Sequence, residues 1–301
     1  MALNLWRLRL LDVFARVGTV RATAAELVMS PSAVSQQLTL LEAETGAVLF
    51  ERAGRRMTLT ATGDLLAERA RGLLDQADAV DAELSDLASG PVGRVRVGGF
   101  ASAISSTLIP AVRRLAHLNP HLELELLEIE PREATTALLQ GRIDLAVTVD
   151  EGDGTLLAPT IAVVPLSTDP LLAVLPVGHE LASRARVSLA DLAAEPWALD
   201  HEGTYLGELV PRECRLAGFE PRVVGRFSSY GVMLAHVASG RSVAVLPALA
   251  VDAAPDVVAR PVAGLADRRI VIAMRTGAAR RGAIIAVVEA LRASTAPHAA
   301  G

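Results

Sequence analysis

The chain has 301 residues, of which 51% are hydrophobic and 21% are charged, and its formal net charge is −5 at pH 7. This composition supports a large buried core, argues against wholesale disorder, and predicts two domains, or one domain with a small module. The single cysteine, Cys214, excludes an internal disulfide scaffold. No Cys/His framework typical of structural zinc is present, so we expect neither a metal nor another cofactor.

The charges are divided unevenly along the chain. Residues 1–58 hold seven Arg and five acidic residues, whereas the remaining 243 residues hold 22 Arg and 29 acidic residues. We therefore expect a surface that binds a polyanion within residues 1–58. The apolar stripe near the N-terminus is interrupted by charges and is typical neither of a signal peptide nor of a membrane span. These features predict a cytoplasmic protein without membrane contact.

Short helices fill the first part of the chain, each with a capping residue before it or a glycine after it. Two short apolar segments then flank a basic turn. The predicted elements are a helix from Asn4 to Gly18, a helix over 20–27, a helix from Ser30 to Gly46, and strands over 48–50 and 57–59 around the turn 51–56. Three helices followed by a hairpin predict a winged helix-turn-helix domain over residues 1–60.

Residues 61–89 are expected to form one long linker helix. Its apolar residues recur at alternating spacings of four and three, and this 3.5-residue repeat is typical of the seam between two helices of a coiled coil. The alternative interpretation is an amphipathic helix that lies on the surface of its own domain. The predicted dimer seam consists of Leu66, Leu73, Val80, Leu84 and Leu87.

From residue 92 onward, predicted strands alternate with helices, a pattern that indicates parallel βαβ units with both sheet faces covered. The strands are expected over 94–97, 122–127, 143–149, 161–164, 171–175, 243–246 and 270–274, and the helices over about 105–118, 133–139, 206–217, 231–238 and 284–291. The overall fold class is therefore α/β.

The third helix carries the strongest chemical signal. Its apolar residues occupy one face, whereas uncharged hydrogen-bonding side chains occupy the other and could contact base edges in a major groove. The N–H groups at its start favour phosphate. Arginines on the predicted wing would contact the DNA backbone or the minor groove. The candidate DNA-binding residues are Ser30, Pro31, Ser32, Ser35, Gln36, Thr39, Arg52, Arg55 and Arg56.

These motifs resemble those of the LysR-type transcriptional regulators. The resemblance is specific in the N-terminal domain and looser in the remainder. It is carried by Gly18-Thr19, Ala24 to Leu27, Ser30 to Leu38, Leu41-Glu42, Gly46, Leu49 to Arg52, Leu59-Thr60 and Gly63, and then by Leu108 to Pro110, Asn119-Pro120, Gly141 to Ala146, Leu175 to His179 and Gly240 to Pro247.

The resemblance implies a C-terminal effector domain over 92–301 with two lobes, similar to type 2 periplasmic binding proteins. We expect lobe I to comprise about 92–164 and 268–294, and lobe II about 165–265. The family implies a dimer that often pairs into a tetramer, an imperfect palindromic operator in double-stranded DNA, and a small-molecule effector between the lobes. It also implies an effect on RNA polymerase and a protein associated with the nucleoid.

Ligands of open α/β sheets bind beyond the carboxyl ends of the strands, close to helix N-termini. Three segments of the predicted lobes fit that position, and in the family Ser102 would supply an effector-binding hydroxyl. The adjacent Asp200 and Glu202 repel a carboxylate, so the ligand is expected to be neutral, cationic or zwitterionic. The candidate effector-binding residues are Ala101, Ser102, His201, Thr204, Tyr205, Ser228, Ser229 and Tyr230.

The predicted function is therefore that of a sequence-specific transcriptional regulator whose DNA binding responds to an effector. Alternatives are a ligand-independent DNA-binding protein, or a small-molecule-binding protein of the same fold without a regulatory role. No convergent nucleophile, acid–base pair or metal set suggests catalysis, because neighbouring residues such as Asp200 and His201 point to opposite faces of a strand. We thus expect no enzyme and no catalytic residues.

Overall fold

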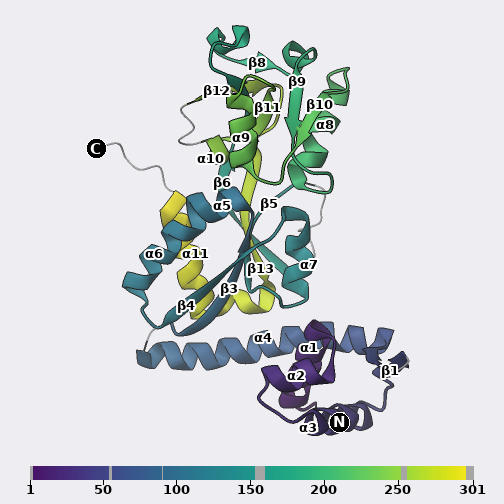
Figure 1. Ribbon diagram of the computed structural model, residues 1–301. Helices are drawn as coiled ribbons and strands as arrows, with labels where there is room; N and C mark the ends of the chain where they lie inside the picture. The colour runs from purple at the N-terminus through teal and green to yellow at the C-terminus, as the bar shows by residue number, and fades with distance from the viewer. Residues whose placement is uncertain (1–2, 54–55, 90, 153–159, 252–255, 296–301) are drawn as a thin grey trace.

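The computed structural model describes residues 3–53, 56–89, 91–152, 160–251 and 256–295. It has three parts, which are an N-terminal helical unit, two stacked α/β lobes, and one long helix that runs between that unit and the lower lobe (Figure 1). No helix among the described residues is long and apolar enough to cross a membrane.

The N-terminal unit is built as its capping residues predict. The side chains of Asn4, Thr19 and Ser30 each accept a backbone N–H at the start of a helix, and Gly18 and Gly46 end two helices with positive φ angles of 73° and 66°. Two antiparallel strands form the wing. The elements are α1 (Leu5–Val17), α2 (Val20–Glu26), α3 (Pro31–Thr45), β1 (Phe50–Ala53) and β2 (Arg56–Leu59).

Helix α4 (Ala61–Ser89) belongs to the N-terminal unit through its first half. Ala67, Ala70 and Leu74 are buried in one cluster with residues of α1 and α3, and Leu66 packs partly against the same cluster. The predicted seam is therefore divided, because the early part of the apolar stripe covers the helix's own domain. Leu73 and Val80 are 44% and 56% exposed, whereas the side chains of Leu84 and Leu87 lie outside the described residues.

Lobe I is a five-stranded sheet with the order β4-β3-β5-β13-β6 and apolar clusters on both faces. A nearly continuous helix covers residues 101–118 after the first strand, which is four residues earlier than predicted. The strands are β3 (Gly93–Gly99), β4 (Leu122–Glu128), β5 (Leu145–Val149), β6 (Ile161–Asp169) and β13 (Arg268–Arg275); the helical elements are α5 (Ala101–Ala103), η1 (Ile104–Leu108), α6 (Ile109–Leu118), η2 (Pro131–Glu133), α7 (Ala134–Leu139), η5 (Thr276–Arg280) and α11 (Gly282–Thr295).

Lobe II has its own core around the fully buried Trp197. It contains a four-stranded sheet with the order β11-β7-β12-β8 and a parallel pair of strands, β10-β9. The strands are β7 (Leu171–Pro176), β8 (Val187–Ser188), β9 (Pro196–Leu199), β10 (Arg222–Arg226), β11 (Ala244–Pro247) and β12 (Val257–Ala263); the helical elements are η3 (Glu180–Ser183), η4 (Ala190–Leu192), α8 (Tyr205–Leu216), α9 (Tyr230–Ala238) and α10 (Ala248–Val251).

The prediction of parallel βαβ units throughout is wrong. Strands β3, β4 and β5 are parallel, but β13 runs antiparallel to both β5 and β6, and β7 runs antiparallel to β11 and β12. Strand β6 also extends to Asp169, beyond the predicted end at Val164, because pairing with β13 carries it past the polar residues Ser167 and Thr168. The chain therefore passes between the lobes at about residue 170 and again at 264–267.

Candidate functional site

The exposed face of α3 presents the residues that were expected to contact DNA. Ser30, Pro31, Ser32, Ser35, Gln36 and Thr39 are all exposed, whereas Val34, Leu38 and Leu41 are buried on the opposite face. The short turn before this helix places Val28, which is 93% exposed, at a positive φ of 53°. A β-branched residue rarely adopts this conformation, so the turn between α2 and α3 is sharply defined.

Hydrogen bonding separates the two glutamines of α3. Gln37 accepts a hydrogen bond from Nε of Arg7 at 3.0 Å and helps to fasten α3 to α1. The side chain of Gln36 makes no hydrogen bond to any described residue and is exposed. Ser30 is used as the helix cap, and the Thr39 hydroxyl donates to the Ser35 carbonyl at 3.0 Å. Gln36 therefore retains its full bidentate capacity for an external partner.

The arginines of the N-terminal unit fall into two groups. Arg7, Arg9 and Arg16 form ion pairs with Glu44, Asp78 and Glu26, respectively. Arg52 on the wing and Arg21 in the first turn of α2 are exposed and form no ion pair with any described residue. Sequence analysis missed Arg21, although its place at the start of the helix that precedes α3 was a usable signal. Arg55 lies outside the described residues, as does the side chain of Arg56.

A narrow cavity between the lobes brings together all three segments predicted to bind the effector. Phe100 and Ala101 lie at the start of α5, Asp200 follows β9 and Tyr205 begins α8, and Ser228 and Tyr230 lie at the start of α9; Glu128, Glu130, Pro131 and Arg268 complete the lining. The cavity volume is about 20 Å³, which is room for about one water molecule. An organic effector therefore requires the lobes to separate further.

Four predicted residues do not line this cavity. The Thr204 hydroxyl caps α8 by accepting the Gly207 N–H at 3.0 Å, and His201 and Ser229 are exposed. Ser102 is 4% exposed, and its hydroxyl has no hydrogen-bond partner among the described residues. Buried polar groups without a partner are uncommon, so this hydroxyl is available to a ligand that reaches the first turn of α5.

The lining residues outside the predicted set are mostly charged, and they include Asp200, which was expected to lie beside the ligand. Glu130 accepts the Tyr205 N–H across the lobes at 3.4 Å, and burial raises the pKa of its carboxyl. Asp200 accepts the His201 N–H at 2.8 Å, and burial likewise raises the pKa of its carboxyl. Burial also raises the pKa of the phenol groups of Tyr205 and Tyr230. The cavity therefore holds carboxyl groups that lack a cation of their own.

Arg268 is the basic residue of the cavity, but it is already paired. Its guanidinium contacts Asp169 in an ion pair whose two side chains are each 1% exposed, with Nε 3.2 Å from Oδ2. The Phe100 ring lies 4.8 Å from its Cζ atom. Because Asp169 and Arg268 are direct partners on β6 and β13, this ion pair joins the two strands that lead into lobe II.

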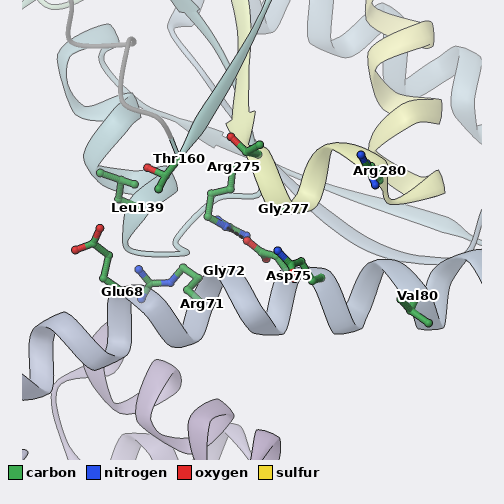
Figure 2. A pocket seen from close by; sticks show the side chains of 12 residues that line it. Glu68, Arg71, Gly72, Asp75, Val80, Leu139, Thr160, Arg275, Gly277 and Arg280 are labelled. Carbon is green, nitrogen blue, oxygen red and sulfur yellow. Dashed lines mark hydrogen bonds and ion pairs between the residues drawn. The ribbon is translucent and has the colours of Figure 1, made fainter.

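A larger cavity, of about 700 Å³, lies below lobe I between α4 and η5 (Figure 2). None of the predicted effector-binding residues lines it. Helix N-termini from both lobes converge at the smaller cavity instead. No group of three His, Cys, Asp or Glu side chains in the described part of the chain could hold a metal ion.

The chain matches two family models. One, described as the LysR substrate binding domain, matches residues 88–296, and the other, described as bacterial regulatory helix-turn-helix protein, lysR family, matches residues 5–64. A probable hydrogen peroxide-inducible genes activator of Streptomyces viridosporus is 31% identical over 281 residues, covering 90% of this chain and 88% of that protein. The regulator ShiR of Corynebacterium glutamicum is 32% identical over 230 residues, covering 74% and 75%.

Solved structures share the fold over nearly the whole chain. A full-length OxyR variant from Pseudomonas aeruginosa has a TM-score of 0.78 at 24% identity and covers 97% of this chain and 98% of its own. Full-length CbnR in complex with its target DNA has a TM-score of 0.56 at 24% identity and covers 97% of this chain and 100% of its own. These structures contain the same succession of helical unit, long helix and two lobes.

The raised pKa of Asp200 predicts how stability depends on pH. A carboxyl whose folded pKa exceeds its unfolded value of about 3.9 contributes stability below that value, and this contribution is lost as pH rises through the folded pKa. We expect Asp200→Asn to raise the Tm at pH 8, by about 2–4 °C for each kcal/mol recovered, and to give no gain near pH 4. Thermal unfolding followed by circular dichroism measures this difference.

Asp191→Asn is the control with the opposite sign. Hydrogen bonds from the hydroxyl and backbone N–H of Ser188, assisted by Arg184, lower the pKa of the Asp191 carboxyl to about 2. Removing this carboxylate should lower the Tm at pH 8 and have a smaller effect as pH falls toward 2. A Tm gain from Asp200→Asn that is equal at pH 4 and pH 8 would contradict the assignment.

Proposed function

The chain belongs to the LysR family of bacterial regulatory helix-turn-helix proteins, and we propose that it reads a dyad-symmetric DNA site with α3 under the control of a small cationic effector. The single observation that carries the first half is the free, exposed side chain of Gln36 on a helix whose other face is buried. A regulator that binds the chromosome acts in the cytoplasm, at the nucleoid, and its partners include RNA polymerase.

Base reading rests on the uncharged groups of α3. Gln36 can bind adenine in a bidentate manner, and Ser32 and Ser35 can bond base edges or a phosphate. The exposed Arg21 and Arg52, together with Arg55 and Arg56, supply phosphate contacts that are independent of sequence. Because Arg7, Arg9 and Arg16 are neutralised within the protein, the free positive charge is concentrated beside the reading helix.

Selection of random-sequence duplexes by the purified protein tests this reading. We expect the wild type to enrich a spaced, dyad-symmetric motif, and Gln36→Ala to lose preference at one position of each half-site, which corresponds to about 1–3 kcal/mol of discrimination. Gln37→Ala is the matched control, since this neighbour is occupied by Arg7 and should leave the motif unchanged. An unchanged motif with Gln36→Ala would refute the role of Gln36.

Dimerisation is proposed to use the free face of α4. Leu73 and Val80 are exposed apolar residues seven positions apart, which is the spacing of equivalent positions in a coiled coil. These residues lie beyond the part of α4 that packs against its own domain. An exposed apolar stripe of this kind can pack against the α4 helix of a second copy.

Leu73→Glu should convert dimers to monomers in sedimentation velocity, because a carboxylate would be buried in the seam. The same change would weaken operator binding, since each half-site would be bound alone. Leu65→Glu is the matched control, because Leu65 is 53% exposed on the same helix but lies off the stripe. Equal dimerisation of both variants would exclude this seam.

The effector is proposed to be a compact cation, such as a primary ammonium compound. Glu128, Glu130 and Asp200 line the cavity, while the charge of Arg268 is already balanced by Asp169. A carboxylate effector would add a negative charge to this set, whereas an ammonium group would neutralise part of it and donate hydrogen bonds to it. Tyr205 and Tyr230 offer aromatic faces for a cation or for an apolar stem.

Thermal-shift assays test whether the effector is a cation. The compounds are matched pairs of amines and acids, such as butylamine and butyrate, together with diamines such as putrescine. We expect a dose-dependent rise in Tm with amines at pH 7.5, by RT ln(1 + [L]/Kd), and a loss of this rise in Glu130→Gln. Glu123→Gln is the control, since Glu123 is an exposed carboxylate on β4 outside the cavity. Stabilisation by acids but not by amines would overturn the proposal.

Thiol-based sensing is not part of the proposed function, although relatives are named for induction by hydrogen peroxide. The only cysteine of this chain, Cys214, is fully buried in the core of lobe II. Burial raises the pKa of its thiol to about 12, and a thiol that stays protonated at neutral pH is a poor nucleophile toward peroxide.

A further inference from the structure

Over the part of α4 whose side chains are described, the helix is attached to lobe I mainly by polar contacts. Among the described residues, the apolar cluster that includes Ala67, Ala70 and Leu74 contains only members of the N-terminal unit, and the clusters of lobe I contain no residue of α4. The cavity of about 700 Å³ separates much of the helix from the lobe (Figure 2). Where the described part of α4 shares no apolar cluster with lobe I, the attachment can be released without exposing either of these clusters to water.

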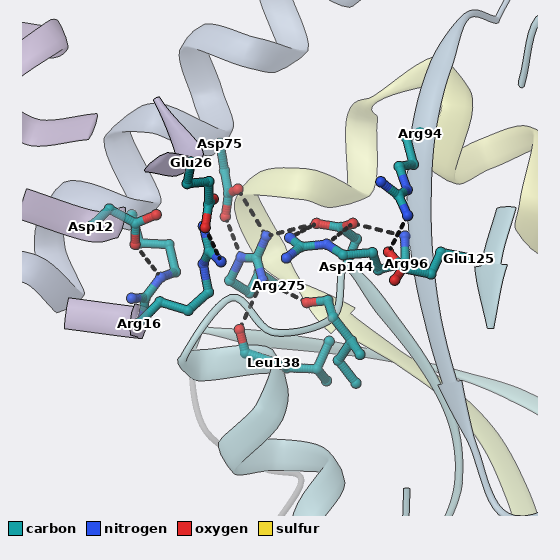
Figure 3. A network of polar contacts seen from close by, with 12 residues as sticks. Asp12, Arg16, Glu26, Asp75, Arg94, Arg96, Glu125, Leu138, Asp144 and Arg275 are labelled. Atoms are coloured by element: carbon teal, nitrogen blue, oxygen red, sulfur yellow. Dashed lines mark hydrogen bonds and ion pairs between the residues drawn. The ribbon is translucent and has the colours of Figure 1, made fainter. Parts of the chain in front are cut away.

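One ion pair forms the centre of this attachment. Nε and one terminal nitrogen of Arg275 lie 2.6 and 3.1 Å from the two carboxylate oxygens of Asp75, which is a bidentate geometry. The two residues are 7% and 5% exposed. Figure 3 shows Asp75 reaching down from α4 to meet the guanidinium at the end of β13.

Arg275 is held in lobe I independently of Asp75. Its remaining terminal nitrogen donates to the carbonyl oxygens of Leu138 and Ile143 at 2.8 and 3.1 Å. Asp144 lies 3.6 Å away and is itself fixed by the backbone N–H and the guanidinium of Arg96 (Figure 3). Loss of Asp75 would therefore leave Arg275 in place and compensated, and would release the helix alone.

A glycine allows the close approach that the ion pair needs. A Cβ atom at Gly277 would lie 3.0 Å from the Cβ of Asp75 and 3.4 Å from the carbonyl oxygen of Gly72. The backbone of η5 thus lies directly against α4 beside the ion pair. Nε of Arg71 lies 2.7 Å from Asp12 of α1, which joins α4 to the rest of the N-terminal unit, and the same side chain lies beside Gly141 of lobe I.

A single strand connects this attachment to the effector cavity. Strand β13 begins at Arg268, which lines the cavity between the lobes, and ends at Arg275, which binds α4. Residues 270–274 pair with β5 and residues 268–275 pair with β6, with one irregularity in the β6 pairing between Ile270 and Val271. The residue that lines the effector cavity and the residue that binds α4 thus stand at the two ends of one strand.

We propose that Asp75, Arg275 and Gly277 form a releasable latch that fixes the orientation of the DNA-reading unit relative to lobe I. With the latch closed, α4 is held against η5 in the orientation of this structure. With the latch open, α4 and the rest of the N-terminal unit move as one body relative to lobe I. This regulatory role rests on the proposed function, whereas the latch itself does not.

Hydrogen–deuterium exchange of the full-length protein, without DNA or effector, tests the latch. We expect Asp75→Asn to speed exchange of the backbone amides of residues 276–281 and of the facing part of α4 by roughly tenfold. Asp78→Asn is the matched control, because Asp78 lies three residues further along α4 and pairs with Arg9 of α1 rather than with lobe I. In Asp78→Asn, the backbone amides of residues 276–281 should exchange at the same rate as in the wild type.

Gly277→Ala opens the same contact by sterics and should reproduce the Asp75→Asn pattern. Exchange at 276–281 within twofold of the wild type in Asp75→Asn would overturn the latch. On a selected operator, Asp75→Asn should change the DNA bend measured with circularly permuted fragments. An unchanged bend despite faster exchange would show that the ion pair is a structural contact without a regulatory role. Failure of the wild type to bind any specific operator would contradict the proposed function. The exchange experiment would still show whether Asp75 holds α4 against lobe I.

Discussion

Two buried arginines at the ends of β13 connect the three parts of this molecule. Arg268 pairs with Asp169 where the chain passes into lobe II, and Arg275 pairs with Asp75 where lobe I meets the long helix. A buried ion pair is costly to break on one side only, since the remaining charge is left without compensation. Charged contacts therefore help to hold the lobes and the N-terminal unit in a defined arrangement, together with Tyr205, which packs against the cores of both lobes.

Hydrogen-bond and ion-pair partners also identify the groups that are free to act on other molecules. In α3, Gln37 is used to hold Arg7 and Gln36 is not, although the two residues are neighbours of the same type. In the cavity between the lobes, Arg268 is occupied by Asp169, which leaves the carboxyl groups of Glu130 and Asp200 without a cation. Exposure alone does not show which of these groups is free to bind another molecule, whereas the partner of each group does.

Local patterns predicted the N-terminal unit well, because its signals are short in sequence. Asn4, Ser30, Gly18 and Gly46 mark helix ends through capping and positive φ, and they act in the structure as the sequence indicates. Segments around Ala101, Tyr205 and Tyr230 were also placed together correctly, since each follows a strand and opens a helix. The ligand-binding role of these segments stays a prediction.

The same reasoning could not predict contacts between residues far apart in the sequence. The antiparallel course of β13 depends on a return of the chain from lobe II about 100 residues later, and nothing local to Arg268 reports its partner Asp169. Glu130 and Arg268 were missed for this reason. The stripe on α4 was read as one seam, whereas Ala70 is buried in the core of the N-terminal unit, because a heptad pattern does not reveal which apolar surface it meets.

The most direct test of this account asks whether the effector cavity is coupled to α3, the helix proposed to read DNA. A stabilising amine is titrated into the protein alone and into the protein saturated with its operator duplex. Linkage requires that DNA change the affinity for the amine by the same factor by which the amine changes the affinity for DNA. We expect a factor of roughly 5–150, as is typical of such couplings. Equal affinity for the amine with and without the operator would show that the two sites are independent and would contradict this view of the molecule.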